Sequence, residues 1–143
     1  MSIPSWLSSR LIYLTKHGSH AYGTNISTSD LDLRGVTIPP KPYFLGLSKF
    51  EQHEAKSTSN LFYADNHQQA PEEPLTEVVI YELRKFLMLA ANGNPNITEI
   101  LFTDPIDHVI LTSIGEQLLA ARDIFLSKKM RYTFSGYATA QLK

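Results

Sequence analysis

Residues 17–35 read HGSHAYGTNISTSDLDLRG, and this stretch carries the features that decide the fold. It contains the small pair Gly18-Ser19. After ten intervening residues come Asp30 and Asp32, with one residue between them. Side chains two residues apart on a β-strand point to the same face of the sheet, so we expect the two carboxylates to converge. Two carboxylates that converge on one point are typical of a magnesium site.

The Gly18-Ser19 pair predicts a turn that binds phosphate at the N-terminus of a helix. Backbone N–H groups and the partial positive charge of the helix end attract an anion, and the serine hydroxyl adds a donor. A phosphate-binding turn followed by paired carboxylates is the combination that a nucleotidyltransferase needs. The metal bridges phosphate oxygens and neutralises the charge that develops during transfer.

Two other ligand motifs fit the same stretch less well. Gly18 and Gly23 match half of a P-loop, but the next position is Thr24, where that motif requires the lysine that reaches the phosphates. His17 and His20 lie three residues apart, yet no helix is predicted across this turn, so they need not share a face that could hold zinc.

A calcium loop is also excluded. Asp30, Asp32 and Gly35 occupy positions one, three and six of an EF-hand pattern. Arg34 and Lys41 fall at positions five and twelve, where calcium requires oxygen ligands.

Composition narrows the class of protein. The chain has 143 residues, 43% of them hydrophobic, which suffices for one folded domain without disulfides or structural zinc. It has no cysteine, which excludes a thiolate metal site and a cysteine nucleophile. Its net charge of −1 restricts any phosphate-binding surface to a local patch.

No apolar run approaches the roughly 20 residues that span a bilayer, and the start of the chain lacks the basic-then-apolar order of a signal peptide. A cytoplasmic protein without membrane contact is expected.

The first half predicts strands. Residues 11–14 form a short apolar run, residues 32–38 alternate in polarity and end at two prolines, and a third extended segment lies near residues 49–55. Residues 56–74 are rich in polar residues and proline, which indicates a loop or a lid.

The second half predicts helices. Apolar residues recur at helical spacing at Val79, Leu83, Phe86, Leu87 and Ala90. Asn92-Gly93 is a stop signal, and Asn96 with Glu99 three residues later is an N-cap pattern.

Ser113 with Glu116 repeats the N-cap pattern, and a last helix is predicted from about Arg131. One face of that helix carries Phe134, Tyr137 and Leu142, and we expect the aromatic side chains in the core. A basic cluster precedes them: Lys128, Lys129 and Arg131. The helix reaches Lys143 without a cap, so we expect the front part of a longer protein.

The spacing of Gly18-Ser19 and Asp30-Leu31-Asp32 resembles the signature of the DNA polymerase β superfamily of nucleotidyltransferases. Further blocks are similar to the nucleotidyltransferases predicted in bacteria and their phages, some of which are associated with RNA ligases. These blocks are residues 18–24, 29–35, 81–87, 93–96, 99–102, 134–138 and 141–143.

The resemblance implies an α/β (α+β) fold, with a small mixed β-sheet, helices packed behind it and a helical C-terminal part. Residues 1–143 would form a single nucleotidyltransferase domain. Its catalytic core would cover about residues 1–110, and residues 111–143 would be a helical extension.

The resemblance also implies a third carboxylate on a neighbouring strand. Glu77, within residues 75–80, is the first choice for a metal site formed with Asp30 and Asp32, and these three would be the catalytic residues. Glu82 and Glu54 stay open as alternatives, although Glu82 is expected on the first turns of the following helix.

The nucleotide is expected to contact Gly18, Ser19, His20, Tyr22 and Arg34. Gly18 and Ser19 would hold the β- and γ-phosphates. Arg34 could equally form an exposed ion pair with Asp32 instead of contacting a phosphate or the nucleotide.

The expected activity is magnesium-dependent transfer of a nucleoside monophosphate from an NTP to a hydroxyl. Two Mg²⁺ ions would act during turnover, with Mn²⁺ as an alternative. The family resemblance favours an RNA 3′ end as acceptor. A protein hydroxyl, as in toxin–antitoxin nucleotidyltransferases, and a non-catalytic NTP-binding module stay open, as do nucleotide preference and oligomeric state.

Overall fold

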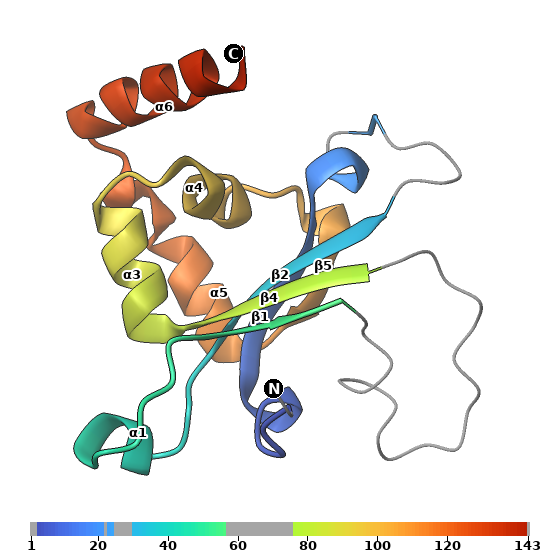
Figure 1. The fold of residues 1–143 in the computed structure, drawn as a ribbon, viewed down its shortest axis with the longest axis vertical. Coiled ribbons are helices and arrows are strands. Elements are labelled where there is room, and N and C mark those ends of the chain that lie inside the picture. Colours follow the sequence, from blue (N-terminus) through green and yellow to red (C-terminus); the bar gives the residue numbers. More distant parts are fainter. Residues whose placement is uncertain (1–2, 22, 25–29, 57–75, 143) are drawn as a thin grey trace.

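The computed structural model describes residues 3–21, 23–24, 30–56 and 76–142, and within them five strands form one mixed sheet (Figure 1). The strand order is β3-β4-β2-β1-β5. β2 and β4 run parallel, and the other neighbouring pairs are antiparallel. The strands are β1 (Leu11–His17), β2 (Leu31–Thr37), β3 (Gln52–Ala55), β4 (Thr76–Glu82) and β5 (His108–Leu111).

Helices follow the fourth strand and cover one face of the sheet, which confirms an α+β fold with a mixed sheet (Figure 1). The α-helices are α1 (Pro42–Leu45), α3 (Leu83–Ala91), α4 (Pro95–Leu101), α5 (Ser113–Ala120) and α6 (Lys128–Gln141). Short 3₁₀ turns are η1 (Ser8–Arg10), η2 (Gly18–His20), η3 (Pro105–Asp107) and η4 (Arg122–Phe125). Among these helices, none has the length and apolar character needed to cross a membrane.

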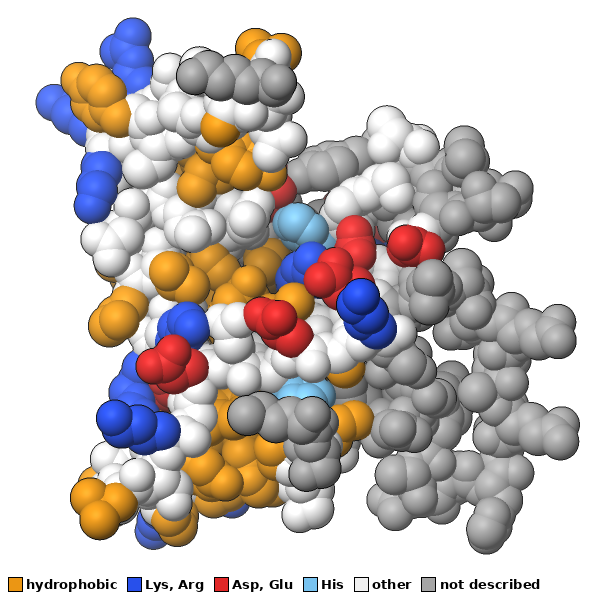
Figure 2. Space-filling model, in the orientation of Figure 1, with side chains coloured by type: hydrophobic (Ala, Val, Ile, Leu, Met, Phe, Trp, Pro, Cys, Tyr) orange, Lys and Arg blue, Asp and Glu red, His pale blue; other side chains and the backbone are white. Residues whose placement is uncertain are grey.

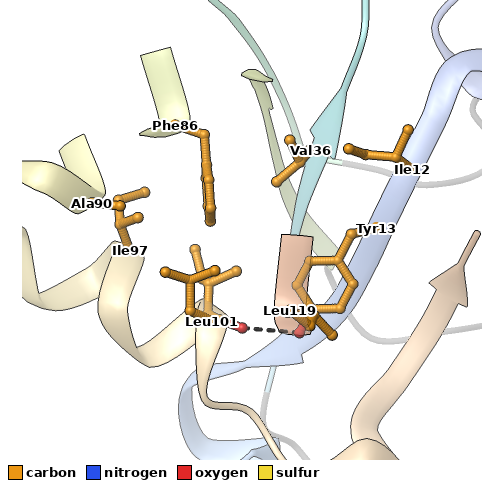
Figure 3. Packing of buried hydrophobic residues seen from close by; sticks show 9 residues of the cluster. Ile12, Tyr13, Val36, Phe86, Ala90, Ile97, Leu101 and Leu119 are labelled. Carbon is orange, nitrogen blue, oxygen red and sulfur yellow. Dashed lines mark hydrogen bonds between the residues drawn. The ribbon is translucent and has the colours of Figure 1, made fainter. Parts of the chain in front are cut away.

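The core has two parts because strand side chains alternate between the sheet faces. On the helix-covered face, Tyr13 and Val36 pack against Phe86, Ile97 and Leu119 of α3, α4 and α5 (Figure 3). The buried Tyr13 hydroxyl donates a 2.9 Å hydrogen bond to the carbonyl of Ile100, which satisfies its polar atom within this core.

The opposite sheet face carries the second cluster: Leu7, Leu11, Leu14, Leu33, Val78 and Ile80. The N-terminal segment covers it, and Trp6 packs edge-on to Phe50 with ring centroids 5.0 Å apart. The two clusters hold both faces of β1, β2 and β4, so these three central strands form a rigid base for the residues at their ends.

The predicted strands are confirmed, with small shifts at their ends. β1 starts at Leu11 as expected and runs on to His17, β2 lies within one residue of residues 32–38, and β3 lies inside residues 49–55. Of the predicted loop at residues 56–74, all but the first residue lie outside the described residues. β5 was not predicted, because a four-residue edge strand carries little pattern of its own.

Three details of the helix prediction are wrong. Val79 belongs to β4, and the helix starts only at Leu83, because the apolar run 78–80 serves a strand buried on both faces. Asn94, not Asn96, caps α4 by accepting a hydrogen bond from the Ile97 N–H at 3.3 Å.

Similarly, Thr112 and not Ser113 caps α5, by accepting from the Gly115 N–H at 3.3 Å. In both cases the polar residue one or two positions earlier already has the extended backbone that a cap requires.

α6 also differs from the prediction. It starts at Lys128 rather than near Arg131, and it buries none of its residues. Tyr137 is exposed, so the expectation that it belongs to the core is wrong. α6 is anchored near its start, where the Thr133 hydroxyl donates to the carbonyl of Gly93 at 2.7 Å.

Candidate active site

Three polar side chains lie side by side across the centre of the sheet. Asp32 of β2 is in register with His17 at the end of β1 and with Glu77 near the start of β4. Residues in register on neighbouring strands point to the same face. This face is the one that carries Tyr13 and Val36, so the three residues lie at the edge of the helix-covered core.

Gly18 lies directly against the carboxylate of Asp32. Its φ of +67° is in the region that favours glycine. A Cβ atom at this position would lie 2.5 Å from Asp32 Oδ2, so the Asp32 side chain would have to shift. The glycine of the motif therefore lets the chain turn and brings the backbone of η2 next to the Asp32 carboxylate of the predicted site.

The turn after Gly18 is shorter than the predicted helix. η2 is a single 3₁₀ turn, closed by the Ala21 N–H donating to the Gly18 carbonyl at 3.1 Å. Ser19 is half-buried in this turn, and its carbonyl accepts from the Thr24 N–H at 3.0 Å. A single turn has only a small dipole, so local N–H groups and the serine hydroxyl would have to supply an anion site here.

The structure does not describe the side chains of two residues that were expected to contact nucleotide. The side chain of His20 and the whole of Tyr22 lie outside the described residues. Asp30 is described, and it is exposed immediately before β2.

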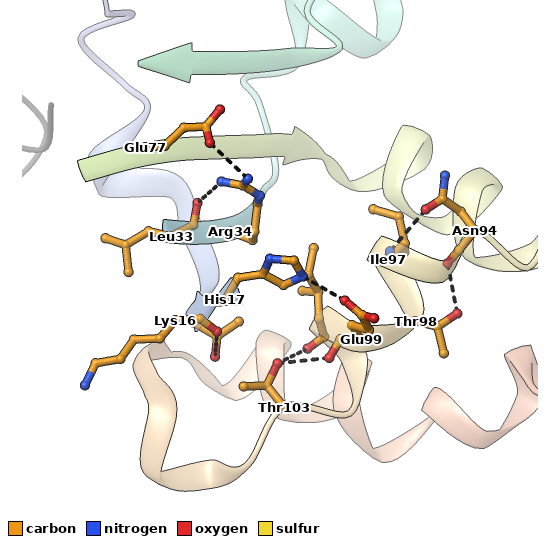
Figure 4. A network of polar contacts seen from close by, with 12 residues as sticks. Lys16, His17, Leu33, Arg34, Glu77, Asn94, Ile97, Thr98, Glu99 and Thr103 are labelled. Carbon is orange, nitrogen blue, oxygen red and sulfur yellow. Dashed lines mark hydrogen bonds and ion pairs between the residues drawn. The ribbon is translucent and has the colours of Figure 1, made fainter. Parts of the chain in front are cut away.

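Arg34 pairs with Glu77 rather than with Asp32. Its Nη2 lies 3.4 Å from Glu77 Oε2, and its Nη1 donates to the Leu33 carbonyl at 3.2 Å (Figure 4). The arginine side chain is largely buried, whereas that of Glu77 is 54% exposed. The ion pair that was expected with Asp32, as an alternative to a nucleotide contact, is therefore wrong. Arg34 instead forms an ion pair that joins β2 and β4.

The three candidate third carboxylates have different surroundings. Glu77 is the strand neighbour of Asp32. Glu82 is buried at the end of β4, where it caps α3 by accepting from the Lys85 N–H at 3.1 Å and pairs with Arg84 at 3.0 Å. Glu54 is exposed on β3, one strand further from Asp32, and accepts a hydrogen bond from Gln52. Placement therefore favours Glu77, and Glu82 has a structural task.

His17 joins this group from β1. Its Nε2 lies 3.2 Å from Glu99 Oε2 of α4, at an angle outside hydrogen-bond geometry (Figure 4). Burial, followed by the nearby guanidinium of Arg34, holds the pKa of His17 below its usual value, while Glu99 and Asp32 pull it upward. A neutral imidazole at neutral pH follows from this balance.

Part of this group lines a cleft of about 630 Å³ between the sheet and helices α4 and α6, whereas Ser19, Asp30 and Glu77 are not among its lining residues. The sheet contributes Asp32 and Arg34, and η2 contributes Gly18. Acidic, basic and histidine side chains gather on the face that Figure 2 shows, close to α6. Other lining residues are His17, Glu54, Val79, Tyr81, Asn96, Glu99, Tyr137 and Gln141.

Several of these lining residues were missed as site residues by sequence reasoning. His17 could have been found from strand pairing, because it directly precedes the Gly18-Ser19 motif and lies opposite Asp32. Tyr137 and Gln141 lie in a block that the family resemblance included, but the sequence does not show that this block returns to the sheet.

The carboxylates fit a magnesium ion by chemistry and by strand register. Asp32 and Glu77 offer oxygen ligands from neighbouring strands, and Gly18 leaves room at the Asp32 oxygen. In the described part of the chain, no three acidic or histidine side chains are arranged closely enough to hold a metal ion as they lie. A three-carboxylate site thus requires the exposed Glu77 side chain to turn away from Arg34.

Unlike Arg34, the basic side chains of α3 and of the start of α6 lie away from this cleft. Arg84 and Lys85 both form ion pairs, Arg84 with Glu82, and Lys85 with Glu51 at 3.2 Å. In the cluster at the start of α6, Lys129 donates to the Asn92 side chain at 3.2 Å.

Comparisons with known proteins identify a family and two relatives of this chain. The model of the RNA repair pathway DNA polymerase beta family (RlaP) matches residues 3–143. An uncharacterized 38.9 kDa protein of Enterobacteria phage T4, from the nrdC-mobD intergenic region, is 32% identical over 88 residues, which cover 62% of this chain and 24% of that protein. The uncharacterized protein YcgL of Bacillus subtilis is 26% identical over 138 residues, which cover 94% of this chain and 46% of YcgL.

The chain thus spans less than half the length of either relative. No solved structure matches it significantly. The family match nevertheless extends over almost every residue, including the Gly18-Ser19 turn and the strand that carries Asp32. The chain belongs to the RNA repair pathway DNA polymerase beta family.

Proposed function

We propose that this chain transfers a nucleoside monophosphate from an NTP to the 3′ hydroxyl of an RNA, forming a phosphodiester bond at the α-phosphate and releasing pyrophosphate. The observation that carries the proposal is the contact between Gly18 and the Asp32 carboxylate, with Glu77 in register on the next strand. This arrangement brings a phosphate-binding turn and acidic side chains to one point of the sheet. Few groups need to react themselves, because this chemistry depends mainly on positioning and charge neutralisation.

Each residue has a defined task in this proposal. The N–H groups and hydroxyl of the Gly18-Ser19 turn hold the β- and γ-phosphates. Asp30, Asp32 and Glu77 hold Mg²⁺, which would supply charge neutralisation on the phosphate oxygens. Arg34, released from Glu77, contacts a phosphate, because a guanidinium binds phosphate oxygens in the same way as it binds carboxylate oxygens.

The family description favours RNA as the acceptor, since it places related proteins in RNA repair. The net charge of this chain, −1, does not favour one acceptor over the other. A protein hydroxyl remains the competing acceptor, and it is an outcome of the test.

The test is incorporation of label from each of the four α-labelled NTPs into a mixed RNA pool with Mg²⁺. We expect transfer by the wild type and a loss of at least a hundredfold in Asp32→Asn. Glu54→Gln, which removes another carboxylate of the same cleft, is the matched control and should retain activity. Label that enters the protein instead of RNA would contradict the RNA acceptor, and absence of any transfer would contradict the transferase.

A further inference from the structure

α6 brings two side chains to the cleft from a distant part of the sequence. Tyr137 and Gln141 are four residues apart, so they lie on the same face of the helix, one turn from each other. Both line the cleft that also contains Gly18, Asp32 and Arg34. In Figure 1 the helix lies beside α4, above the sheet.

The attachment of α6 explains why these two residues are available to a ligand. Met130 and Thr133, in the first half of the helix, pack against Gly93 at the end of α3. None of the described residues of α6 is fully buried, and Tyr137 stays 39% exposed. An aromatic ring that is half exposed within a charged cleft contributes little to the core and offers a surface for a planar ligand.

The size and chemistry of the cleft identify that ligand. A volume of about 630 Å³ exceeds what phosphates and a metal ion at Gly18 and Asp32 would fill. Tyr137 and Gln141 line the same cleft, so an aromatic ring and an amide accompany its charged groups. A nucleotide needs both kinds of partner, because its phosphates are charged and its base stacks on aromatic rings and bonds to amides along its edge.

We propose that Tyr137 and Gln141 bind the base of the incoming NTP, with Tyr137 stacking on the ring and Gln141 reading its edge. This proposal rests on the proposed function, because the phosphates must lie at Gly18 and Asp32 for the base to reach α6. Tyr137 then contributes to the affinity for any nucleotide, and Gln141 determines which base is preferred.

The test compares two ligands that share phosphates but differ in the base. Binding of ATP and of inorganic tripolyphosphate, each with Mg²⁺, is measured by calorimetry for the wild type, Tyr137→Leu and Tyr137→Phe. Loss of base stacking should weaken ATP binding about tenfold in Tyr137→Leu. Tripolyphosphate binding should not change, and Tyr137→Phe should keep the wild-type affinity for both ligands, because it keeps the ring.

Tyr132→Leu is the matched control, since it makes the same substitution on the same helix at a residue that is 77% exposed and away from the cleft lining. It should bind both ligands like the wild type. Gln141→Ala should alter the order of affinities among the four NTPs, again without effect on tripolyphosphate.

Each other outcome overturns the assignment. Unchanged ATP binding in Tyr137→Leu means that the base does not reach α6, and an equal loss for tripolyphosphate means that the substitution disturbs the phosphate site. If Tyr137→Leu weakens binding of a short RNA and not of ATP, α6 holds the acceptor instead. A wild type that binds neither ATP nor tripolyphosphate contradicts the proposed function itself, which separates that failure from failure at Tyr137.

Discussion

At Gly18 a side chain is excluded for two reasons, the positive φ and the adjacent Asp32 carboxylate. Alanine there is expected to destabilise the fold by about 1–2 kcal/mol through backbone strain alone. It should also displace Asp32 and reduce nucleotide transfer about a hundredfold, because small misplacements of catalytic groups have large effects on rate. Urea unfolding and the transfer assay measure the two effects.

Gly23 separates these two effects. Its φ is +66°, nearly the same as at Gly18, but no atom of the described residues lies within 4 Å of a Cβ placed there. Gly23→Ala should therefore lose similar stability and keep most of the activity. Equal loss of activity in both variants would mean that strain in the turn, and not the contact with Asp32, explains the glycine.

Glu77→Gln tests the third carboxylate. The Arg34–Glu77 pair is half exposed at 3.4 Å, so its loss should change the free energy of unfolding by less than about 1 kcal/mol. Transfer activity should fall at least a hundredfold, because the neutral amide is a poor ligand for magnesium. A variant with normal stability and normal activity would exclude Glu77 from the site.

His53 gives the chain a pH-dependent stability. It is 5% exposed on β3, its Nε2 has no partner among the described residues, and burial lowers its pKa. The unfolded chain then binds a proton at a higher pH than the folded chain does. Stability is therefore complete above about pH 6.5, the usual pKa of histidine, and falls as the pH drops below it.

His53→Leu removes this titrating group and leaves no unpaired polar atom. Urea unfolding at pH 7.5 and pH 5.5 should show a smaller acid-induced loss of stability in the variant than in the wild type. His17, whose pKa is also lowered, keeps part of the dependence in both proteins. The same loss in both would show that His53 can be protonated in the folded state.

At the level of elements, the caps show where sequence reasoning stops. Serine and asparagine before an acidic residue predict a helix start, but Thr112 and Asn94 lie one or two residues earlier and take that position. An acidic residue three positions later follows Asn96 and Ser113, but not the observed caps Asn94 and Thr112. Only the path of the chain out of β5, where Thr112 also donates to the Ile12 carbonyl at 3.1 Å, decides between them.

Thr112→Ala is therefore expected to destabilise the protein by about 1 kcal/mol, since it removes the cap of α5. The neighbouring substitution Ser113→Ala should have little effect, because Ser113 is exposed in the first turn. Thermal unfolding measures both, with a shift of about 2–5 °C expected for Thr112→Ala alone. The reverse order of effects would support the cap that the sequence pattern predicts.

At the level of the whole molecule, the sequence predicts the strands that carry the site better than it predicts the site. Local alternation and the spacing of Gly18, Ser19, Asp30 and Asp32 identify β1, β2 and the turn between them. The partners of these residues depend on contacts between distant segments. Glu77 comes next to Asp32 through a parallel strand pairing, although 44 residues separate the two in the sequence. Arg34 turns to Glu77 because of that pairing.

The same reason explains α6. Its aromatic spacing suggests a core helix, but the core is already filled by α3, α4 and α5, so Tyr137 faces the cleft instead. Periodicity predicts that residues share a face of a helix, and tertiary packing decides what that face contacts.

The most direct measurement is a crystal structure with Mn²⁺ and a non-hydrolysable NTP, with the metal located by its anomalous signal. We expect a metal peak in contact with Asp32 and Glu77, triphosphate oxygens at the Gly18-Ser19 turn, and Arg34 turned from Glu77 to a phosphate. A nucleotide bound elsewhere, or an intact Arg34–Glu77 pair with no metal at Asp32, would contradict this expectation.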